Sequence, residues 1–290
     1  MPNNAHLKEK FISFNQFFLL DAIDKMDYME AMNTLRFSAS LSFLFQELPI
    51  FERIHAAKEC GFQGIEFSSP YNADPKEIRN ELKRTNMEFV LLSAPAGKSG
   101  EKGIAALPHR KKECKESIEL ALAYANELDC KKINVLSGIL PATEDYALYL
   151  ETYIENLRDA AQRVAPYEIT LMIEPFCRRV FPGYLIETIE QAKEVIKRVN
   201  EKNVAILFDC FHIQSTEGNL ATRFLENIDL IQHVHIAGVP GRHEPMLGEI
   251  NYSYLFDIIK KSSYAGWIGC EYIPIGKTKE GLEWLGIIQK

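Results

Sequence analysis

Four ionisable residues lie at or near the carboxyl ends of four short apolar segments. The segments are ITLMIEP, VAILFD, IQHVHI and WIGCE, and the residues are Glu174, Asp209, His235 and Glu271. Successive residues are 35, 26 and 36 positions apart (209 − 174, 235 − 209, 271 − 235). A strand, a helix and two loops need roughly 30 residues. We therefore predict four successive strands of a repeating β/α array, with their carboxyl ends on one rim.

Three carboxylates and one imidazole that converge on a point are typical of a divalent-metal site. Oxygen-rich ligands suit Mg²⁺ or Mn²⁺, and the lack of thiolates argues against structural zinc. Cys210 and Cys270 adjoin two of the candidates, but strand alternation turns them to the opposite face. His233 shares the parity of His235 and lies deeper, so we predict His235 as the ligand and a hydrogen-bonded role for His233. Taken singly, a strand-end Glu is as often a helix cap or a salt-bridge partner, and a lone His in IQHVHI is more often a hydrogen-bonded core residue.

The remaining sequence from residue 35 onward alternates strands with helices. Strands are predicted at 35–41, 64–67, 87–94, 132–138, 169–174, 204–209, 231–236 and 267–271. Helices are predicted at 51–60, 75–86, 111–129, 187–199, 220–227, 252–262 and 279–288, with a further helix capped by Thr143. Eight such pairs predict a (β/α)8 TIM barrel, with residues 34–290 as one catalytic domain. A doubly wound sheet is the alternative, but the chain lacks the early G-x-G-x-x-G turn which that fold needs.

Residues 1–33 stand apart from this pattern. Apolar residues in FISFNQFFLLDAIDKM recur at helical spacing, which predicts an N-terminal helical extension, either packed on the barrel or mobile. A secretory signal is the competing interpretation. Asn15, Gln16 and Asp21 interrupt the apolar run, and no A-x-A cleavage site follows. Three later methionines leave the start of translation open: Met26, Met29 and Met32.

The composition bounds the class of protein. The 290 residues are 47% hydrophobic, which is ordinary globular usage. The net charge of −7 argues against a nucleic-acid partner, because phosphate binding normally needs a basic face. None of the six cysteines forms a C-x-x-C pair, so we expect reduced thiols and a cytoplasmic location. No apolar run approaches the roughly 18–20 residues of a membrane span. Homo-oligomerisation is left open.

Several motifs resemble the hydroxypyruvate isomerase family, which belongs to the xylose-isomerase-like barrels. The motifs are EP at 174–175, DCFH at 209–212, HVHIAGVPGR at 233–242, GEINY at 248–252 and GCEY at 269–272. RFSASLSFLF near the start and the loop GEKGIAALPHR add to the set. The resemblance covers about residues 35–286, and its specificity comes from the ordered set rather than from any one motif.

The resemblance implies interconversion of hydroxypyruvate and 2-hydroxy-3-oxopropanoate (tartronate semialdehyde). A proton leaves one carbon, an enediolate forms, and a proton returns to the neighbouring carbon. This chemistry needs a cation near the developing oxyanion and groups that move protons. We predict that Glu174 and Glu271 transfer protons and also bind the metal together with Asp209 and His235.

Four further residues are candidates for binding the small hydroxy- or oxo-acid substrate. His212 follows strand 204–209 in a predicted loop, where its alternative role is to cap the next helix. Arg242 offers a guanidinium fork to the substrate carboxylate; otherwise it is solvated or paired with Glu244. Glu66 binds a hydroxyl or forms a buried salt bridge. Lys102 lies in a loop expected to act as a lid, although a merely exposed basic loop is the alternative.

Departures from the family pattern bear on the substrate rather than on the chemistry. Cys177 stands where Asn is common, Met246 and Leu247 replace a glycine-rich turn, and His235 stands where some members carry Gln. One alternative is therefore an isomerase or epimerase for a longer sugar or oxo-acid. A metal-dependent endonuclease of the abasic-site type and a non-catalytic binding barrel are the other two.

Overall fold

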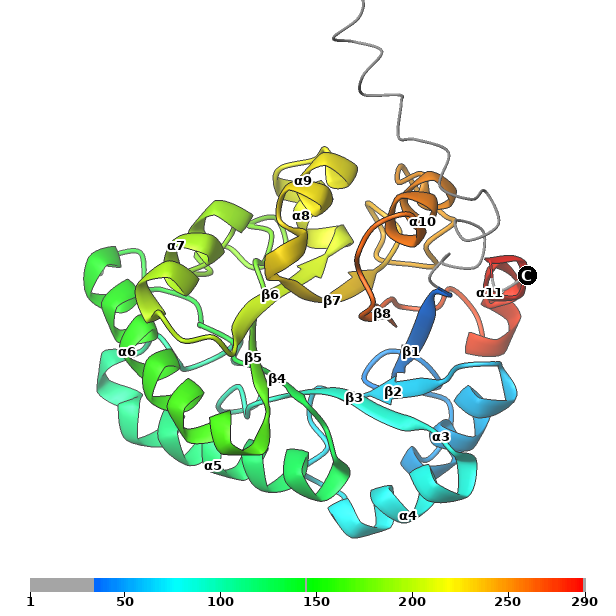
Figure 1. Ribbon diagram of the computed structural model, residues 1–290, viewed down its shortest axis with the longest axis horizontal. Helices are drawn as coiled ribbons and strands as arrows, with labels where there is room; N and C mark the ends of the chain where they lie inside the picture. Colours follow the sequence, from blue (N-terminus) through cyan, green and yellow to red (C-terminus); the bar gives the residue numbers. More distant parts are fainter. Residues whose placement is uncertain (1–33, 144, 289–290) are drawn as a thin grey trace, which may run out of the picture. The chain divides into compact units, whose positions relative to one another are not determined.

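The computed structural model describes residues 34–143 and 145–288, so the helix expected within residues 1–33 lies outside the described chain. Within these residues, eight parallel strands close into a barrel in sequence order (Figure 1). The strands are β1 (Arg36–Ser40), β2 (Gly64–Glu66), β3 (Glu88–Ser93), β4 (Lys132–Asn134), β5 (Thr170–Ile173), β6 (Val204–Asp209), β7 (Ile231–Ile236) and β8 (Trp267–Cys270). The predicted (β/α)8 barrel is confirmed.

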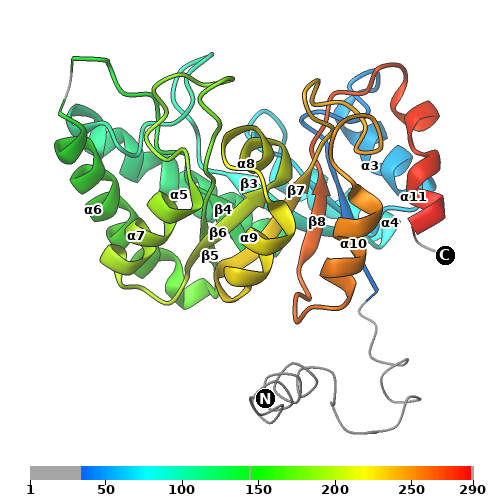
Figure 2. The ribbon, with the colours of Figure 1, turned by 90° about the horizontal axis from the view of Figure 1, so that it is seen from above.

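Helices follow the strands and cover the outside of the barrel (Figure 1). They are α3 (Ile50–Glu59), α4 (Pro75–Thr85), α5 (Lys111–Leu128), α6 (Tyr146–Val164), α7 (Ile189–Val199), α8 (Cys210–Thr216), α9 (Leu220–Glu226), α10 (Tyr252–Lys260) and α11 (Glu283–Ile288). Figure 2 looks across the barrel and shows the longer connections after the strands along its upper edge. Among the described residues, no helix has the length and apolar character needed to cross a membrane.

Alternation along each strand decides which side chains enter the barrel. In β6, Ala205 and Leu207 belong to the inner apolar cluster, and Asp209 shares their parity. In the same way, Trp267 of β8 belongs to the inner apolar cluster, and Glu271 shares its parity. The inner cluster consists of Val90, Leu91, Met172, Ala205, Leu207 and Trp267. It forms an apolar floor, and Asp209 and Glu271 lie above it at the carboxyl ends of β6 and β8.

Three local features differ from the sequence-based expectation. β4 ends at Asn134 because the following segment leaves the barrel, where Ser137 forms an antiparallel bridge with Gly103. α6 is capped by Asp145, whose carboxylate accepts a hydrogen bond from the Ala147 N–H at 2.9 Å, and not by Thr143. The segment after β6 is the short helix α8 rather than a loop.

Candidate active site

The four strand-end residues meet inside the carboxyl rim of the barrel. Glu174 follows β5, Asp209 ends β6, His235 lies in β7 and Glu271 follows β8. One ligand atom from each lies within 4.8 Å of those of the others, and all four residues are buried. His235 Nδ1 is 3.8 Å from Glu174 Oε1 and 3.5 Å from Glu271 Oε2. The structure thus brings together all four residues selected from the sequence.

The register of the last strands sets this arrangement. Asp209 lies beside His235, and His235 lies beside Gly269 of β8. Gly269 provides the space that the neighbouring side chains use. A Cβ atom at this position would lie 2.5 Å from Glu66 Oε1 and 2.6 Å from His235 Cδ2. A larger residue would therefore displace either the imidazole or the carboxylate.

Glu66 supports His235 from the floor of the site. Its Oε2 atom accepts hydrogen bonds from His233 Nε2 at 2.8 Å and Ser38 Oγ at 3.1 Å, while Oε1 lies 3.0 Å from His235 Nε2. Burial opposes ionisation, but His235 and His233 hold the pKa of Glu66 well below its usual value. Glu66 is thus a buried ionised partner of both histidines, and His235 keeps Nδ1 toward the other candidate ligands. His233 occupies the deeper, hydrogen-bonded position expected from its parity.

Glu174 is held by Asn134, a residue that sequence reasoning missed. The Asn134 Nδ2 atom donates a hydrogen bond of 2.7 Å to Glu174 Oε2. Burial, together with the negative charges of Glu271 and Asp209, raises the pKa of Glu174 to about 7, although His235 acts in the opposite direction. A carboxyl group with such a pKa can exchange protons near neutral pH. The one available signal for Asn134 was an uncharged polar residue inside the predicted strand 132–138.

Asp209 combines two tasks because it ends β6 and begins α8. Its Oδ1 atom accepts hydrogen bonds from the backbone N–H groups of Phe211 at 2.7 Å and His212 at 3.3 Å. This is an N-cap, which satisfies two amides that have no partner within the helix. Oδ2 remains directed toward the site, 3.3 Å from Arg242 Nη2.

His212 lies in the first turn of α8 and not in a loop. Its Nδ1 atom accepts a hydrogen bond from the Cys177 N–H at 3.2 Å, so the proton of the neutral ring resides on Nε2. Nε2 is buried without a hydrogen-bond partner among the described residues, 3.7 Å from Asp209 Oδ2. Burial, and secondarily Arg242, lowers the pKa of His212 well below its usual value. The ring is therefore a neutral N–H donor.

Arg242 contacts two of the candidate ligands. Its Nη2 atom donates hydrogen bonds to Glu271 Oε2 and Asp209 Oδ2, and its guanidinium lies 5.0 and 5.2 Å from the ring centres of Phe43 and Phe211. The alternative pairing with Glu244 is absent within the described chain, where the Glu244 carboxylate accepts from a backbone N–H instead. Arg242 thus balances negative charge among the candidate ligands.

The donor set fits a hard divalent cation. Glu174 Oε1 and His235 Nδ1 are buried atoms without a hydrogen-bond partner in the described chain. Burial lowers the pKa of His235, but Glu66 and Glu271 raise it well above the usual value, which reflects the excess negative charge of the cluster. Oxygen and imidazole ligands without thiolates match the preference of such ions.

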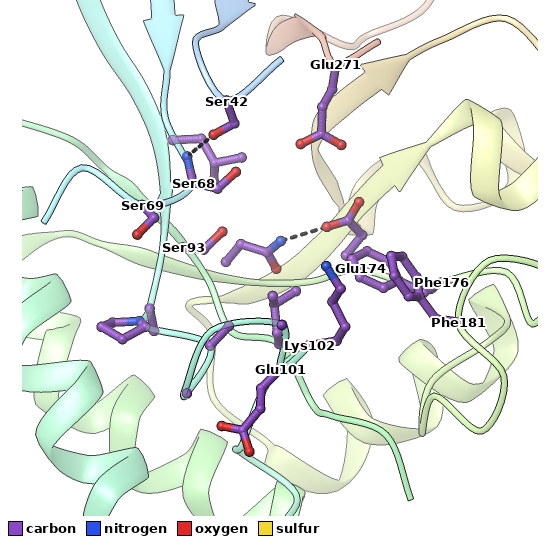
Figure 3. Close-up of a pocket in the computed structure, with 18 of the residues that line it drawn as sticks. Ser42, Ser68, Ser69, Ser93, Glu101, Lys102, Glu174, Phe176, Phe181 and Glu271 are labelled. Atoms are coloured by element: carbon purple, nitrogen blue, oxygen red, sulfur yellow. Dashed lines mark hydrogen bonds between the residues drawn. The ribbon is translucent and has the colours of Figure 1, made fainter. Parts of the chain in front are cut away.

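A cavity of about 500 Å³ adjoins this cluster. One wall carries serine hydroxyls, and the other carries Glu174 and Glu271 (Figure 3). Lys102 reaches into the same cavity from the loop after β3 (Figure 3). The serines are Ser42, Ser68, Ser69 and Ser93. Both of these walls therefore offer polar groups to a ligand.

The sequence matches the family model described as xylose isomerase-like TIM barrel over residues 54–287. The chain belongs to this family. Hydroxypyruvate isomerase of Escherichia coli K12 is 42% identical over 253 residues, which span 87% of this chain and 98% of that protein. The resemblance to the hydroxypyruvate isomerase family is therefore confirmed.

Other proteins similar to this chain carry other names. A 2-oxo-tetronate isomerase of Pectobacterium atrosepticum is 40% identical over 252 residues, covering 86% of this chain and 96% of that protein. The crystal structure of a protein named AP endonuclease, family 2, from Brucella melitensis superposes with a TM-score of 0.85 at 43% identity, covering 87% of this chain and 98% of that chain. The Escherichia coli and Pectobacterium relatives are both isomerases by name.

Proposed function

We propose that the protein is a small oxo-acid isomerase that interconverts hydroxypyruvate and 2-hydroxy-3-oxopropanoate. The observation that carries the proposal is the pair of buried carboxylates, Glu174 and Glu271, gathered with Asp209 and His235 around one point. The isomerases at about 40% identity over most of the chain support the reaction type.

The reaction moves one carbon-bound proton and one oxygen-bound proton. One glutamate removes a proton from C3 of hydroxypyruvate, and a proton is returned to C2, while the hydroxyl proton on O3 passes to O2. The raised pKa of Glu174 suits either direction of transfer. His212 donates Nε2–H to a substrate oxygen and stabilises the enediolate as charge develops there.

Glu174, Asp209, His235 and Glu271 would hold the divalent ion, with Mg²⁺ and Mn²⁺ as the ions that this donor set favours. When bound, the ion supplies positive charge that stabilises an oxyanion. Glu66 keeps His235 oriented, and Asn134 keeps Glu174 oriented, through the contacts described above. Such supporting contacts tune ligands and restrict their motion.

Conversion of 2-oxo-tetronate is the second candidate. Two relatives at 40% identity bear that name, and a cavity of about 500 Å³ with a serine wall has room for an additional hydroxylated carbon. The chemistry at the glutamates is the same for both acids, so the alternative concerns the length of the substrate.

Hydrogen exchange tests the proposal. The protein loaded with Mn²⁺ is incubated in D₂O with hydroxypyruvate or 2-oxo-tetronate, and deuterium at C3 is followed by NMR. We expect exchange with hydroxypyruvate, and a loss of about 10²-fold or more in Glu174→Gln and Glu271→Gln, as for removal of a general base. Exchange with 2-oxo-tetronate alone would favour the second candidate, and exchange with neither acid would contradict both.

Cleavage of DNA at abasic sites is the competing activity, since the Brucella melitensis protein is named an AP endonuclease. The net charge of −7 disfavours a nucleic-acid substrate. The same Mn²⁺-loaded preparation should leave an abasic duplex intact under conditions in which hydroxypyruvate exchanges. Strand cleavage that Glu271→Gln abolishes would support the endonuclease instead.

A further inference from the structure

Among the described residues that line the cavity, one positively charged side chain is available to bind an anionic ligand. Three lysine or arginine side chains of the described chain line it: Lys98, Lys102 and Arg242. Arg242 is committed to Glu271 and Asp209, and Lys98 is exposed. Lys102 is half-buried and forms no ion pair within the described residues. Its ammonium is therefore the cation available to a ligand in the cavity.

Aromatic packing fixes where that ammonium lies. Lys102 Nζ is 5.1 Å from the ring centre of Phe181. Phe181 packs on Phe176 at 5.0 Å, and Phe176 stacks on the His212 ring at 4.6 Å. A ring face attracts the ammonium without using its N–H donors, so all three donors remain available. Through Phe181 and Phe176, Lys102 is thus linked by ring packing to His212.

The loop that carries Lys102 is held at both ends. Gly103 has a φ of +112°, and a Cβ atom there would lie 2.3 Å from the Leu136 carbonyl oxygen. Its N–H donates to the Ala96 carbonyl at 3.1 Å, which closes the loop on itself. The Glu101 carboxylate points away from Glu174 and Glu271 (Figure 3) and pairs with Arg110 at 2.6 Å. These contacts separate Glu101 from Lys102 and present the lysine to the cavity.

The net charge of the site favours a positively charged group, such as the Lys102 ammonium, close to the substrate. With a divalent ion bound, its ligands Glu174, Asp209 and Glu271 would be ionised and its ligand His235 neutral. These carboxylates and Glu66 would then contribute four negative charges, while the ion and Arg242 would contribute three positive ones (2 + 1). The sum is −1 before an anionic substrate enters. A second unbalanced charge in a poorly hydrated cavity is costly unless a cation is near.

We infer that Lys102 binds the carboxylate of the substrate and thereby selects oxo-acids over uncharged ketoses of the same length. This inference rests on the proposed function and assigns the residue that sets its substrate class. The bond is a charge-assisted hydrogen bond from Nζ to a carboxylate oxygen. Arg242 remains with Glu271 and Asp209 and does not take the substrate carboxylate.

A binding experiment tests this without turnover. Calorimetry on the Mn²⁺-loaded protein compares D-glycerate with glyceramide, which differ in the carboxylate alone. Wild-type protein should prefer glycerate, and Lys102→Met, which retains the contact with Phe181, should reduce that preference by about tenfold or more. Lys102→Arg should retain part of it. The control Lys76→Met, an exposed lysine of α4 that does not line the cavity, should bind both ligands as wild type does.

A second measurement separates this inference from the proposed function. The ratio of kcat/KM for hydroxypyruvate over dihydroxyacetone, its uncharged analogue, should fall in Lys102→Met. A preference for glycerate that persists in Lys102→Met, or that is absent from wild type, would overturn the inference even if wild type isomerises hydroxypyruvate. Conversely, a preference that depends on Lys102 in a protein that isomerises neither acid would support the inference and contradict the proposed function.

Discussion

Asn134 is uncharged, yet it fixes a charged atom of the site. Its amide donates to Glu174 Oε2, while Glu174 Oε1 faces the other candidate ligands. Asn134→Ala leaves a buried carboxylate oxygen without its partner, so we expect a loss of about 10- to 100-fold in metal affinity or kcat/KM. Asn134→Asp should be worse because it places a second negative charge beside Glu174. Calorimetric titration with Mn²⁺ and steady-state kinetics measure both; unchanged values in Asn134→Ala would contradict this role.

Gly269 has no side chain, and the space this leaves is occupied by Glu66 and His235. Its substitution by Ala inserts a Cβ atom 2.5 Å from Glu66 Oε1, in a strand where neither neighbour can move freely. Overpacking of this kind costs about 1–3 kcal/mol. We expect Gly269→Ala to lower the free energy of unfolding by that amount, measured in urea, and to weaken Mn²⁺ binding.

The matched control for this prediction is Gly286 in helix α11. A Cβ atom there meets nothing within 4 Å, so Gly286→Ala should raise stability by up to about 1 kcal/mol through helix propensity. Equal destabilisation by the two substitutions would mean that crowding at Glu66 and His235 is not the cause.

At the level of elements, Asp209 joins a strand to a helix, and two substitutions separate its tasks. Asp209→Asn keeps a side-chain oxygen that can accept from the Phe211 and His212 amides, whereas Asp209→Ala removes it. Both remove the ligand charge, so both should lose Mn²⁺ affinity. Only Asp209→Ala should lose the cap, at about 1 kcal/mol in metal-free urea unfolding. Equal stability of the two variants would show that the cap of α8 contributes nothing.

Strands were predictable from sequence where an apolar run was both continuous and bounded. β6 has the predicted limits, because Ala205 and Leu207 join the inner cluster and the side chains between them join the larger outer core. β7 also has the predicted limits, although Gln232 and two histidines interrupt its apolar residues. β4 is shorter than predicted because the segment after it pairs with the loop after β3, where Ser137 bridges Gly103. α8 was missed because it follows β6 directly, with Asp209 as both the last strand residue and the N-cap, so no turn residues separate the two elements.

The closed barrel explains why the ligand set was predictable and its partners were not. Parallel strands place every carboxyl end on one rim, so spacing and parity suffice to gather Glu174, Asp209 and His235. Which contacts Arg242 makes depends instead on a loop whose path no periodicity encodes, including its own φ of +57°. The same holds for Lys102, whose position depends on Phe181 from another connection.

Stability of the whole barrel should depend on the metal, because the rim concentrates like charges in a buried place. Arg242 lies beside Asp209 and Glu271, and His235 lies beside Glu174 and Glu271. Burial and the negative charges of Glu271 and Asp209 nevertheless raise the pKa of Glu174. An ion that binds the folded state alone at 100 times its Kd adds about 2.7 kcal/mol to the free energy of unfolding. For a chain of this size class, that corresponds to a rise in Tm of about 5–10 °C.

Thermal unfolding followed by circular dichroism measures this effect with and without Mn²⁺, and a chelator should reverse it. Glu271→Gln supplies the control, since it removes one ligand charge and leaves the apolar floor of the barrel unchanged. We expect the Mn²⁺-dependent rise in Tm to shrink to less than half in this variant, because fewer charges then hold the ion. A full rise in Glu271→Gln would place the stabilising ion elsewhere, and the cluster at the carboxyl rim would then not be the metal site of this barrel.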